Sequence, residues 1–162
     1  MGVQWKPIPV IDLFAGPGGL GEGFSTILDE NGNPVFKVIM SIEMEKTAHA
    51  TLRLRAFARS IMRDGLLPDE YVSYISSPTK KNMQTLRDSY PDEWNAADIE
   101  AVRGTLVVDD DTYVTMAQQR LEEHYAKYGI RNFVLIGGPP AKRIPSPGGR
   151  DVRIIRMIWN EM

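Results

Sequence analysis

One stretch near the amino terminus decides the fold: Pro9-Val-Ile-Asp-Leu-Phe-Ala-Gly-Pro-Gly-Gly-Leu-Gly-Glu-Gly-Phe24. It starts with a short apolar run at a proline, which is typical of a buried parallel strand. The glycines that follow allow positive φ angles and let the backbone come close to a ligand. Apolar residues then recur at helical spacing, at Leu20, Phe24, Ile27 and Leu28. The stretch therefore predicts a strand, a glycine loop and a helix whose first amide groups point at a ligand.

A second apolar run, from Phe36 to Glu43, predicts the next strand. The segment Asn31-Gly-Asn-Pro34 precedes it and predicts a turn. In doubly wound α/β folds, an acidic residue at the tip of the second strand accepts hydrogen bonds from ribose hydroxyls. Glu43 has this place, and Met44 beside it can pack on the face of an adenine. The chain is thus predicted to bind a ligand that contains a nucleoside.

Two ligand classes fit the glycine loop. The spacing Gly16-x-Gly18-x-x-Gly21 matches the dinucleotide fingerprint, and Glu43 lies at a suitable distance along the chain for the ribose of NAD. A third segment favours a different ligand. It is the apolar run Phe133-Val-Leu-Ile followed by Gly137-Gly-Pro-Pro140, for which a dinucleotide dehydrogenase gives no reason.

These segments, in this order, resemble the cytosine-5 DNA methyltransferase family, through Asp12-Leu-Phe-Ala-Gly-x-Gly-Gly19, Ser41-Ile-Glu43 and Gly137-Gly-Pro-Pro140. The resemblance implies an α/β fold of the Rossmann-like, S-adenosylmethionine-dependent methyltransferase type, with a doubly wound parallel sheet. Its strands are expected at about 8–13, 36–42 and 132–136. The fold is expected to be incomplete, because the family's C-terminal strands and target-recognition region have no counterpart here. The implied cofactor is S-adenosyl-L-methionine, and the implied partner is DNA, which this chain alone would bind weakly or not at all.

The resemblance also implies roles for single residues. The loop residues expected at the methionine end of the donor are Phe14, Ala15, Gly16, Gly18, Gly19 and Leu20, with Asp12 bracing the loop. Glu43 would hold the ribose, Met44 would cover the adenine, and Pro140 would lie beside the donor and a flipped cytosine. The family also has an aspartate on the third strand, for which Asp98-Ile99 and Asp109-Asp-Asp111 are the candidates. For the second candidate we favour a solvated turn in which Asp111 caps the following helix.

The nucleophile of the family is missing. In the family, a cysteine follows Gly-Gly-Pro-Pro, and its thiolate adds to C6 of a cytosine that has left the duplex. Here Ala141 has that position, and none of the 162 residues is a cysteine. The resemblance therefore implies that no residue of this chain is catalytic and that the chain alone does not methylate DNA.

Beyond Pro140 the resemblance stops. If the codons from Ala141 onward are written with suitable synonyms and one T is restored before them, the reading becomes Cys-Gln-Ala-Tyr-Ser-Leu-Ala-Gly-Arg-Ala-Arg, which resembles the family. We therefore expect residues 1–140 to be the donor-binding part of a catalytic domain and residues 141–162 to be an out-of-frame tail. The expected function is that of an N-terminal fragment of a DNA (cytosine-5-)-methyltransferase. Two alternatives stay open: a subunit of a split methyltransferase completed by a second, C-terminal chain, and a NAD-binding Rossmann protein.

The remaining sequence predicts supporting structure. Helices are expected at 46–60 and 112–127, the second ending at Gly129, and residues 61–104 read as an insertion. His49 and His124 have no nucleophile to pair with and are interpreted as surface or helix residues. The remaining candidates are interpreted as a solvated helix face (Arg53, Arg55, Arg59) and as core packing of the insertion (Tyr90, Trp94).

Composition sets limits on function. The net charge of −2 does not favour a DNA-binding face, which is usually basic. The absence of cysteine excludes disulfides and thiolate metal sites, and no metal site is expected. No apolar run is long enough to span a membrane and no signal-peptide pattern is present, so we expect a cytoplasmic chain with no membrane partner.

Overall fold

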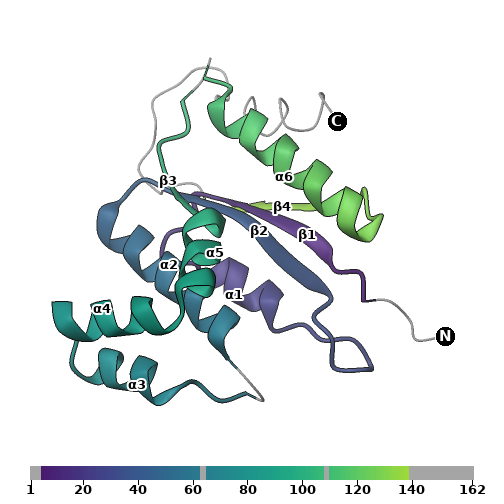
Figure 1. Cartoon of the computed structure of the whole chain (residues 1–162). Coiled ribbons are helices and arrows are strands. Elements are labelled where there is room, and N and C mark those ends of the chain that lie inside the picture. The colour runs from purple at the N-terminus through teal and green to yellow at the C-terminus, as the bar shows by residue number, and fades with distance from the viewer. Residues whose placement is uncertain (1–4, 63–64, 108–109, 139–162) are drawn as a thin grey trace.

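The structure, a computed structural model, describes residues 5–62, 65–107 and 110–138. It is an α/β fold with a four-stranded parallel sheet in the order β3-β2-β1-β4 (Figure 1). The strands are β1 (Ile8–Leu13), β2 (Phe36–Glu43), β3 (Ala101–Arg103) and β4 (Val134–Gly137). The helices are α1 (Gly19–Ser25), α2 (Lys46–Ile61), α3 (Asp69–Ser76), α4 (Lys80–Ser89), α5 (Pro91–Glu100) and α6 (Thr112–Tyr128). The predicted fold class and the three predicted strands are confirmed at this level.

Strand β1 forms the centre of the sheet, between β2 and β4. Its side chains alternate between the two faces, as in any strand. Ile11 and Leu13 pack with Met40 and Ile42 of β2 against the buried face of α6. Asp12 points to the opposite face, where Gly21 of α1 lies against its carboxylate. Helices therefore cover both faces, and full burial of each large apolar side chain contributes about 1.5–3 kcal/mol.

Helices α2 and α6 follow the predicted pattern. Leu52 and Ala56 of α2 are buried, as are Val114, Ala117 and Leu121 of α6. The C-cap of α6 is Gly129, whose φ of 72° is the left-handed conformation that glycine adopts easily. Asp111 is the N-cap residue of α6 but makes no side-chain cap bond; the Asp110 carboxylate accepts the Thr112 N–H instead, at 3.0 Å.

Helix α1 is shorter than its apolar spacing predicts. It ends at Ser25, so Ile27 and Leu28 lie in the following turn. The Ile27 carbonyl accepts a hydrogen bond from the Val35 N–H, and Leu28 bridges to Pro34. The two residues are about half exposed and do not belong to the face of a helix. The hairpin-like return to β2 competes with further helical turns, and its Asn-Gly-Asn-Pro sequence favours the return.

Residues 61–104 contain helices α3, α4 and α5 and also strand β3. The helices pack on the end of α2 around Phe57, with Trp94 and Tyr71 buried beside it. The interpretation of Trp94 as a core residue is thus confirmed. Strand β3 follows α5 without a loop and pairs only with Ser41–Glu43 of β2. The segment expected to be an insertion therefore also supplies the edge of the sheet.

Several predicted surface side chains are not solvated. Arg53 pairs with Asp98 and stacks on Trp94, while Arg59 pairs with Glu22 and Glu100. These arginines join elements of the fold, so the solvated-face interpretation is wrong for both. His124 is buried, and its Nε2 bonds the Pro7 carbonyl at 2.8 Å, while the His49 Nε2 bonds the Ala101 carbonyl at 3.0 Å.

No helix within the described ranges is long and apolar enough to cross a membrane.

Candidate ligand-binding site

The loop after β1 has an unusual backbone. Phe14, Gly16 and Gly18 have φ angles of 56°, 57° and 90°. A bulky residue with positive φ is rare and costs about 1–3 kcal/mol, so the surrounding structure has to hold it. The Ala15 N–H donates to the Ile42 carbonyl at 2.9 Å, and the Gly18 N–H donates to the Ala15 carbonyl at 2.9 Å. The loop is thus folded back over the carboxyl end of β2.

Glu43 fastens this loop through its side chain. Its Oε2 accepts the Gly16 N–H at 2.8 Å, and its Oε1 accepts the Glu45 N–H at 2.7 Å. The residue is only 9% exposed, and no salt bridge to it is found in the described part of the chain. A carboxylate oxygen accepts more than one hydrogen bond, so both oxygens can still accept from hydroxyl groups. Glu43 therefore combines a structural role at the tip of β2 with a carboxylate that has no cationic partner among the described residues.

Helix α2 starts beside Glu43, and its N-cap residue is Glu45. The Glu45 carboxylate accepts the N–H groups of Thr47 and Ala48, at 2.9 and 2.6 Å. These two bonds lower the pKa of Glu45, and the nearby positive charge of Arg103 adds to the effect. The first amides of α2 are therefore already paired. Gly18 lies beside α2, and a Cβ there would lie 2.8 Å from Cδ1 of Leu52. This close contact and its φ of 90° require glycine at position 18.

Asp12 lies behind the loop rather than in it. It is fully buried, and neither carboxylate oxygen completes a hydrogen bond with another described residue. Burial raises the pKa of Asp12 to about 6, although the nearby backbone N–H of Gly21 lowers it in part. Ser41, its partner in the register of β2, also has a buried hydroxyl without a described partner. The loop itself is fastened by Glu43, while the Asp12 carboxylate lies behind it against Gly21 of α1.

The other predicted residues divide into two groups. Gly19 opens α1, and Leu20 and Met44 are 50% and 60% exposed, so both side chains are free to contact a ligand. Ala15 is buried against Leu52 and Ala101 and can offer only its backbone. Pro140 and Ala141 lie outside the described residues.

Strand β4 brings the third predicted segment to the same edge of the sheet. Gly137 lies opposite Leu13 in the parallel register. A Cβ at position 137 would lie 2.7 Å from the Leu13 carbonyl oxygen, so only glycine fits. Because the carboxyl ends of parallel strands share one edge, the glycine loop, Glu43 and Gly137 lie at the same edge of the sheet, where doubly wound folds bind their ligands.

The tip of β3 carries no aspartate. Asp98 lies in α5 and pairs with Arg53 at 3.0 Å, and Asp110 bonds Thr112. The strand instead ends at Arg103 and Gly104, and the Gly104 N–H donates to the Glu43 carbonyl at 3.1 Å. A Cβ on Gly104 would overlap the ring and hydroxyl of Tyr113. Sequence reasoning missed these two residues, because a glycine and a helical tyrosine nine positions apart form no motif.

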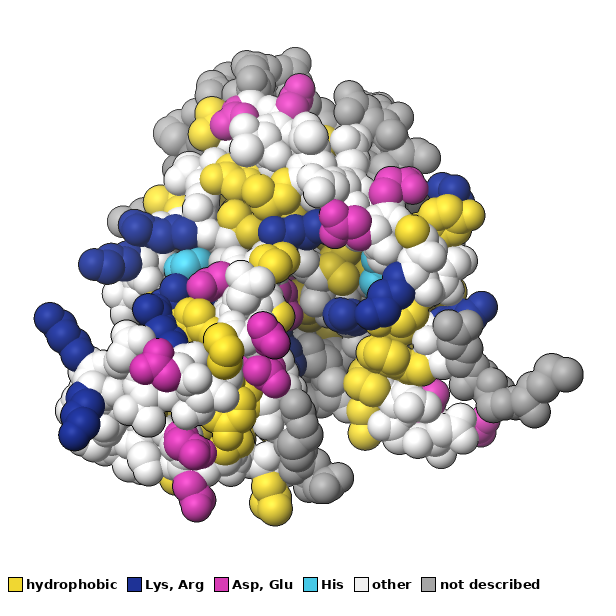
Figure 2. Space-filling model, in the orientation of Figure 1, with side chains coloured by type: hydrophobic (Ala, Val, Ile, Leu, Met, Phe, Trp, Pro, Cys, Tyr) yellow, Lys and Arg dark blue, Asp and Glu magenta, His cyan; other side chains and the backbone are white. Residues whose placement is uncertain are grey.

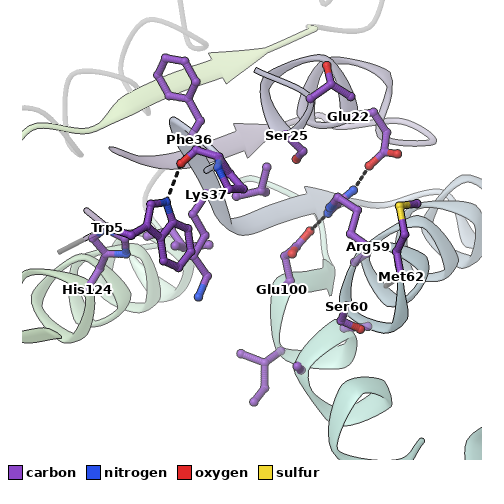
Figure 3. Close-up of a pocket in the computed structure, with 18 of the residues that line it drawn as sticks. Trp5, Glu22, Ser25, Phe36, Lys37, Arg59, Ser60, Met62, Glu100 and His124 are labelled. Carbon is purple, nitrogen blue, oxygen red and sulfur yellow. Dashed lines mark hydrogen bonds and ion pairs between the residues drawn. The ribbon is translucent and has the colours of Figure 1, made fainter. Parts of the chain in front are cut away.

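A large cavity lies elsewhere, along the amino half of β2. It has a volume of about 1050 Å³ and runs between α1, α2 and α5 on one side and α6 on the other (Figures 2 and 3). It exists because β3 pairs only with the last residues of β2. Its apolar walls include Phe36 and Met62, labelled in Figure 3.

Two arginines of this groove are bonded to neighbouring elements of the fold. Arg59 bonds both Glu22 and Glu100, as the dashed lines of Figure 3 show. Burial raises the pKa of Glu100, and the charge of Arg59 opposes this. Arg120 donates to the Ile39 carbonyl at 3.1 Å and so covers part of the open strand edge. The groove is therefore large, but its two arginines already bond other groups of the protein, in contrast to the Glu43 carboxylate at the strand tips.

Across residues 5–138, apart from the two short gaps, no group of three or more histidine, aspartate or glutamate side chains could hold a metal ion. No family model, curated protein or solved structure matches the chain. The proposed function therefore depends on the arrangement of residues at the carboxyl ends of the strands.

Proposed function

We propose that this chain is the donor-binding part of a cytosine-5 DNA methyltransferase, with S-adenosyl-L-methionine as its ligand. The observation that carries the proposal is the Glu43 carboxylate at the tip of β2, bonded to the glycine loop at Gly16 and without a cationic partner among the described residues. A doubly wound fold binds nucleosides at this place, outside the carboxyl ends of its strands. The finer methyltransferase identity is supported by the order of the three segments in the sequence.

The proposed pose follows from the chemistry along the crevice. The loop Phe14–Gly19 turns its backbone toward the ligand and receives the methionine end of the donor. The ribose hydroxyls donate to the Glu43 oxygens, which have capacity left after the two backbone bonds. The exposed Met44 side chain covers one face of the adenine. Gly137, packed against the Leu13 carbonyl, ends β4 at the same edge of the sheet, where the reacting methyl would face a base.

NAD is the competing ligand, and one observation counts against it. In the dinucleotide fingerprint the third glycine allows close packing of helix on strand. Gly21 has this place, and a Cβ there would lie 3.5 Å from the Asp12 carboxylate and 3.6 Å from Val38. These are ordinary contact distances, so the structure does not require glycine at position 21. The need for glycine at 137, which the NAD fingerprint does not include, favours the methyl donor.

Binding without catalysis is the second half of the proposal. Addition to C6 of cytosine needs a thiolate, and the sequence has no cysteine. The complete reaction would also need DNA contacts, which a complementing C-terminal chain would have to supply. Such a reaction would take place in the cytoplasm, where donor and DNA meet.

A single experiment tests both halves. The chain is incubated with donor labelled on its methyl group and with DNA, and bound donor and methylated DNA are counted separately. We expect donor on the protein and no label in cytosine, and the same result for Ala141→Cys. Label in cytosine for the unchanged chain would overturn the proposed lack of catalysis. Absence of bound donor would overturn the proposed ligand. Restoring the reading frame before codon 141 in the gene should restore transfer.

A further inference from the structure

A buried polar layer lies under the glycine loop, between the sheet and α1. Asp12 and Ser41 are opposite each other in the parallel register of β1 and β2. Their neighbours Leu13 and Ile42 pack in the cluster on the α6 side of the sheet. Because side chains alternate along a strand, Asp12 and Ser41 point to the other side, where α1 lies. Asp12 is therefore between Ser41 of the neighbouring strand and Gly21 of α1.

Three oxygen atoms of this layer lack a hydrogen-bond partner. Both carboxylate oxygens of Asp12 and the Oγ of Ser41 are unbonded within the described residues, and both side chains are fully buried. Native proteins nearly always supply a partner to a buried polar group, because an unmade hydrogen bond there is costly. Where no protein group is in reach, the partner is usually an ordered water molecule.

Gly21 leaves room for such a molecule. A Cβ built at position 21 would lie 3.5 Å from the Asp12 Oδ2 and 3.6 Å from Cγ2 of Val38, and no other described atom outside α1 would lie within 4 Å of it. A water oxygen is similar in size to a methyl carbon. From the position of this Cβ it would move about 0.7 Å toward Oδ2 to reach the usual O–H···O distance of about 2.8 Å.

We propose that the space beside Gly21 is a binding site for one water molecule, which donates a hydrogen bond to the Asp12 carboxylate and bonds the Ser41 hydroxyl. The site joins β1 to β2 beneath the loop. It also gives a reason for glycine at position 21, where a methyl group fits sterically but takes the place of the water. A single water molecule does not replace bulk solvent around a carboxylate, so the pKa of Asp12 stays raised. The inference is independent of the ligand that binds at Glu43.

The first test compares two substitutions in α1 by urea titration at neutral pH. Gly23→Ala is the matched control, because its Cβ would meet nothing within 4 Å and neither glycine has a positive φ. Alanine is the better helix former, so Gly23→Ala should raise the urea midpoint. Gly21→Ala has the same gain but displaces the water and leaves buried oxygens unbonded. We expect its midpoint to fall below that of the wild-type chain, and a midpoint at or above the wild-type value would overturn the inference.

A crystal structure of the wild-type chain, at a resolution that shows ordered water, is the second test. It should contain a water oxygen within hydrogen-bond distance of the Asp12 carboxylate and of the Ser41 Oγ. Crystals of Gly21→Ala should lack this water and keep the backbone of α1 in place. A direct hydrogen bond between Asp12 and Ser41, or a dry space beside Gly21, would overturn the inference. A displaced α1 in Gly21→Ala with no water in the wild-type chain would assign the lost stability to steric overlap and overturn it as well.

Discussion

The two ends of strand β2 hold carboxylates in opposite ways. At the carboxyl end, the Glu43 carboxylate accepts two backbone N–H groups and forms no ion pair with a described residue. Beside the amino half, Glu100 and Glu22 share the single guanidinium of Arg59. Backbone amides fix a carboxylate without a counter-charge, whereas an ion pair supplies one. The comparison indicates that the carboxyl end of β2 is prepared for a ligand and that the groove is part of the scaffold.

The largest effect is expected in the groove. Arg59→Ala leaves Glu100 and Glu22 without their shared cation, and a partly buried carboxylate without a partner is costly. We expect the free energy of unfolding to fall by about 1–3 kcal/mol in urea titrations, because the three side chains are 19%, 23% and 35% exposed and solvent screens part of the cost of breaking a fully buried pair. Donor affinity of the folded variant should stay unchanged. A loss below about 0.5 kcal/mol would show that solvent screens the three charges and that these ion pairs do not hold the scaffold together.

A substitution at Glu43 should change ligand affinity more than the free energy of unfolding. Glu43→Ala removes a charge-assisted acceptor from the ribose and should weaken binding of S-adenosylhomocysteine by about 1.5–3 kcal/mol. It also frees the N–H groups of Gly16 and Glu45, so a smaller loss of stability, about 1 kcal/mol, should accompany it. Calorimetry measures the first effect and urea titration the second.

Glu45→Gln is the control for Glu43, since Glu45 is a neighbouring carboxylate that bonds only its own helix. Its affinity should equal that of the wild-type chain. If Glu43→Ala binds with unchanged affinity, Glu43 does not touch the ribose, and the contrast between the two ends of β2 loses its functional meaning.

Asp12 adds a third case, a buried carboxyl with neither amide nor cation bonded to it. Its pKa is about 6 in the folded chain, against 3.8 for an ordinary aspartate. Because the folded pKa is the higher one, the protonated form is stabilised, and Asp12 lowers stability as pH rises from about 4 to 6. The difference should reach up to about 3 kcal/mol and then stay constant.

Asp12→Asn removes this titration. In urea titrations at several pH values, the variant should become more stable relative to the wild-type chain as pH rises from about 4 to 6. Parallel curves for the two proteins would show that Asp12 is solvated or paired in the folded state.

The smallest effect is expected at a half-exposed ion pair. Arg53 and Asp98 are 3.0 Å apart with side chains 25% and 44% exposed, and Arg53 also stacks on Trp94 at 4.9 Å. Arg53→Ala should lower the free energy of unfolding by about 0.5–1 kcal/mol. A loss as large as that of Arg59→Ala would contradict the difference we draw between a single ion pair and an arginine shared by two carboxylates.

The sequence predicts the parts of this fold that repeat a local pattern. Strands β1, β2 and β4 are apolar runs bounded by glycine or proline, and α2 and α6 show apolar residues at helical spacing. Strand β3 could not be predicted from an apolar run, because it has three residues, follows α5 directly and buries only Ala101. No local pattern links Glu22, Arg59 and Glu100, which three different helices supply.

The same distinction between local sequence patterns and tertiary packing applies to the candidate site. Glu43 and the glycine loop could be predicted, because an acid at a strand tip and glycines in a turn are local signals. The pairing of Gly104 with Tyr113 could not, since it depends on how α6 packs against the edge strand. The engagement of Asp98 with Arg53 also depends on the packing of α5 against α2.

The most direct test of the central claim is calorimetric titration of the wild-type chain with S-adenosylhomocysteine and, separately, with NAD. We predict saturable binding of S-adenosylhomocysteine at one site per chain and no heat of binding for NAD. Binding of NAD without binding of S-adenosylhomocysteine would contradict the claim and favour a dinucleotide-binding protein. Binding of neither ligand would show that the crevice at Glu43 does not take a nucleoside.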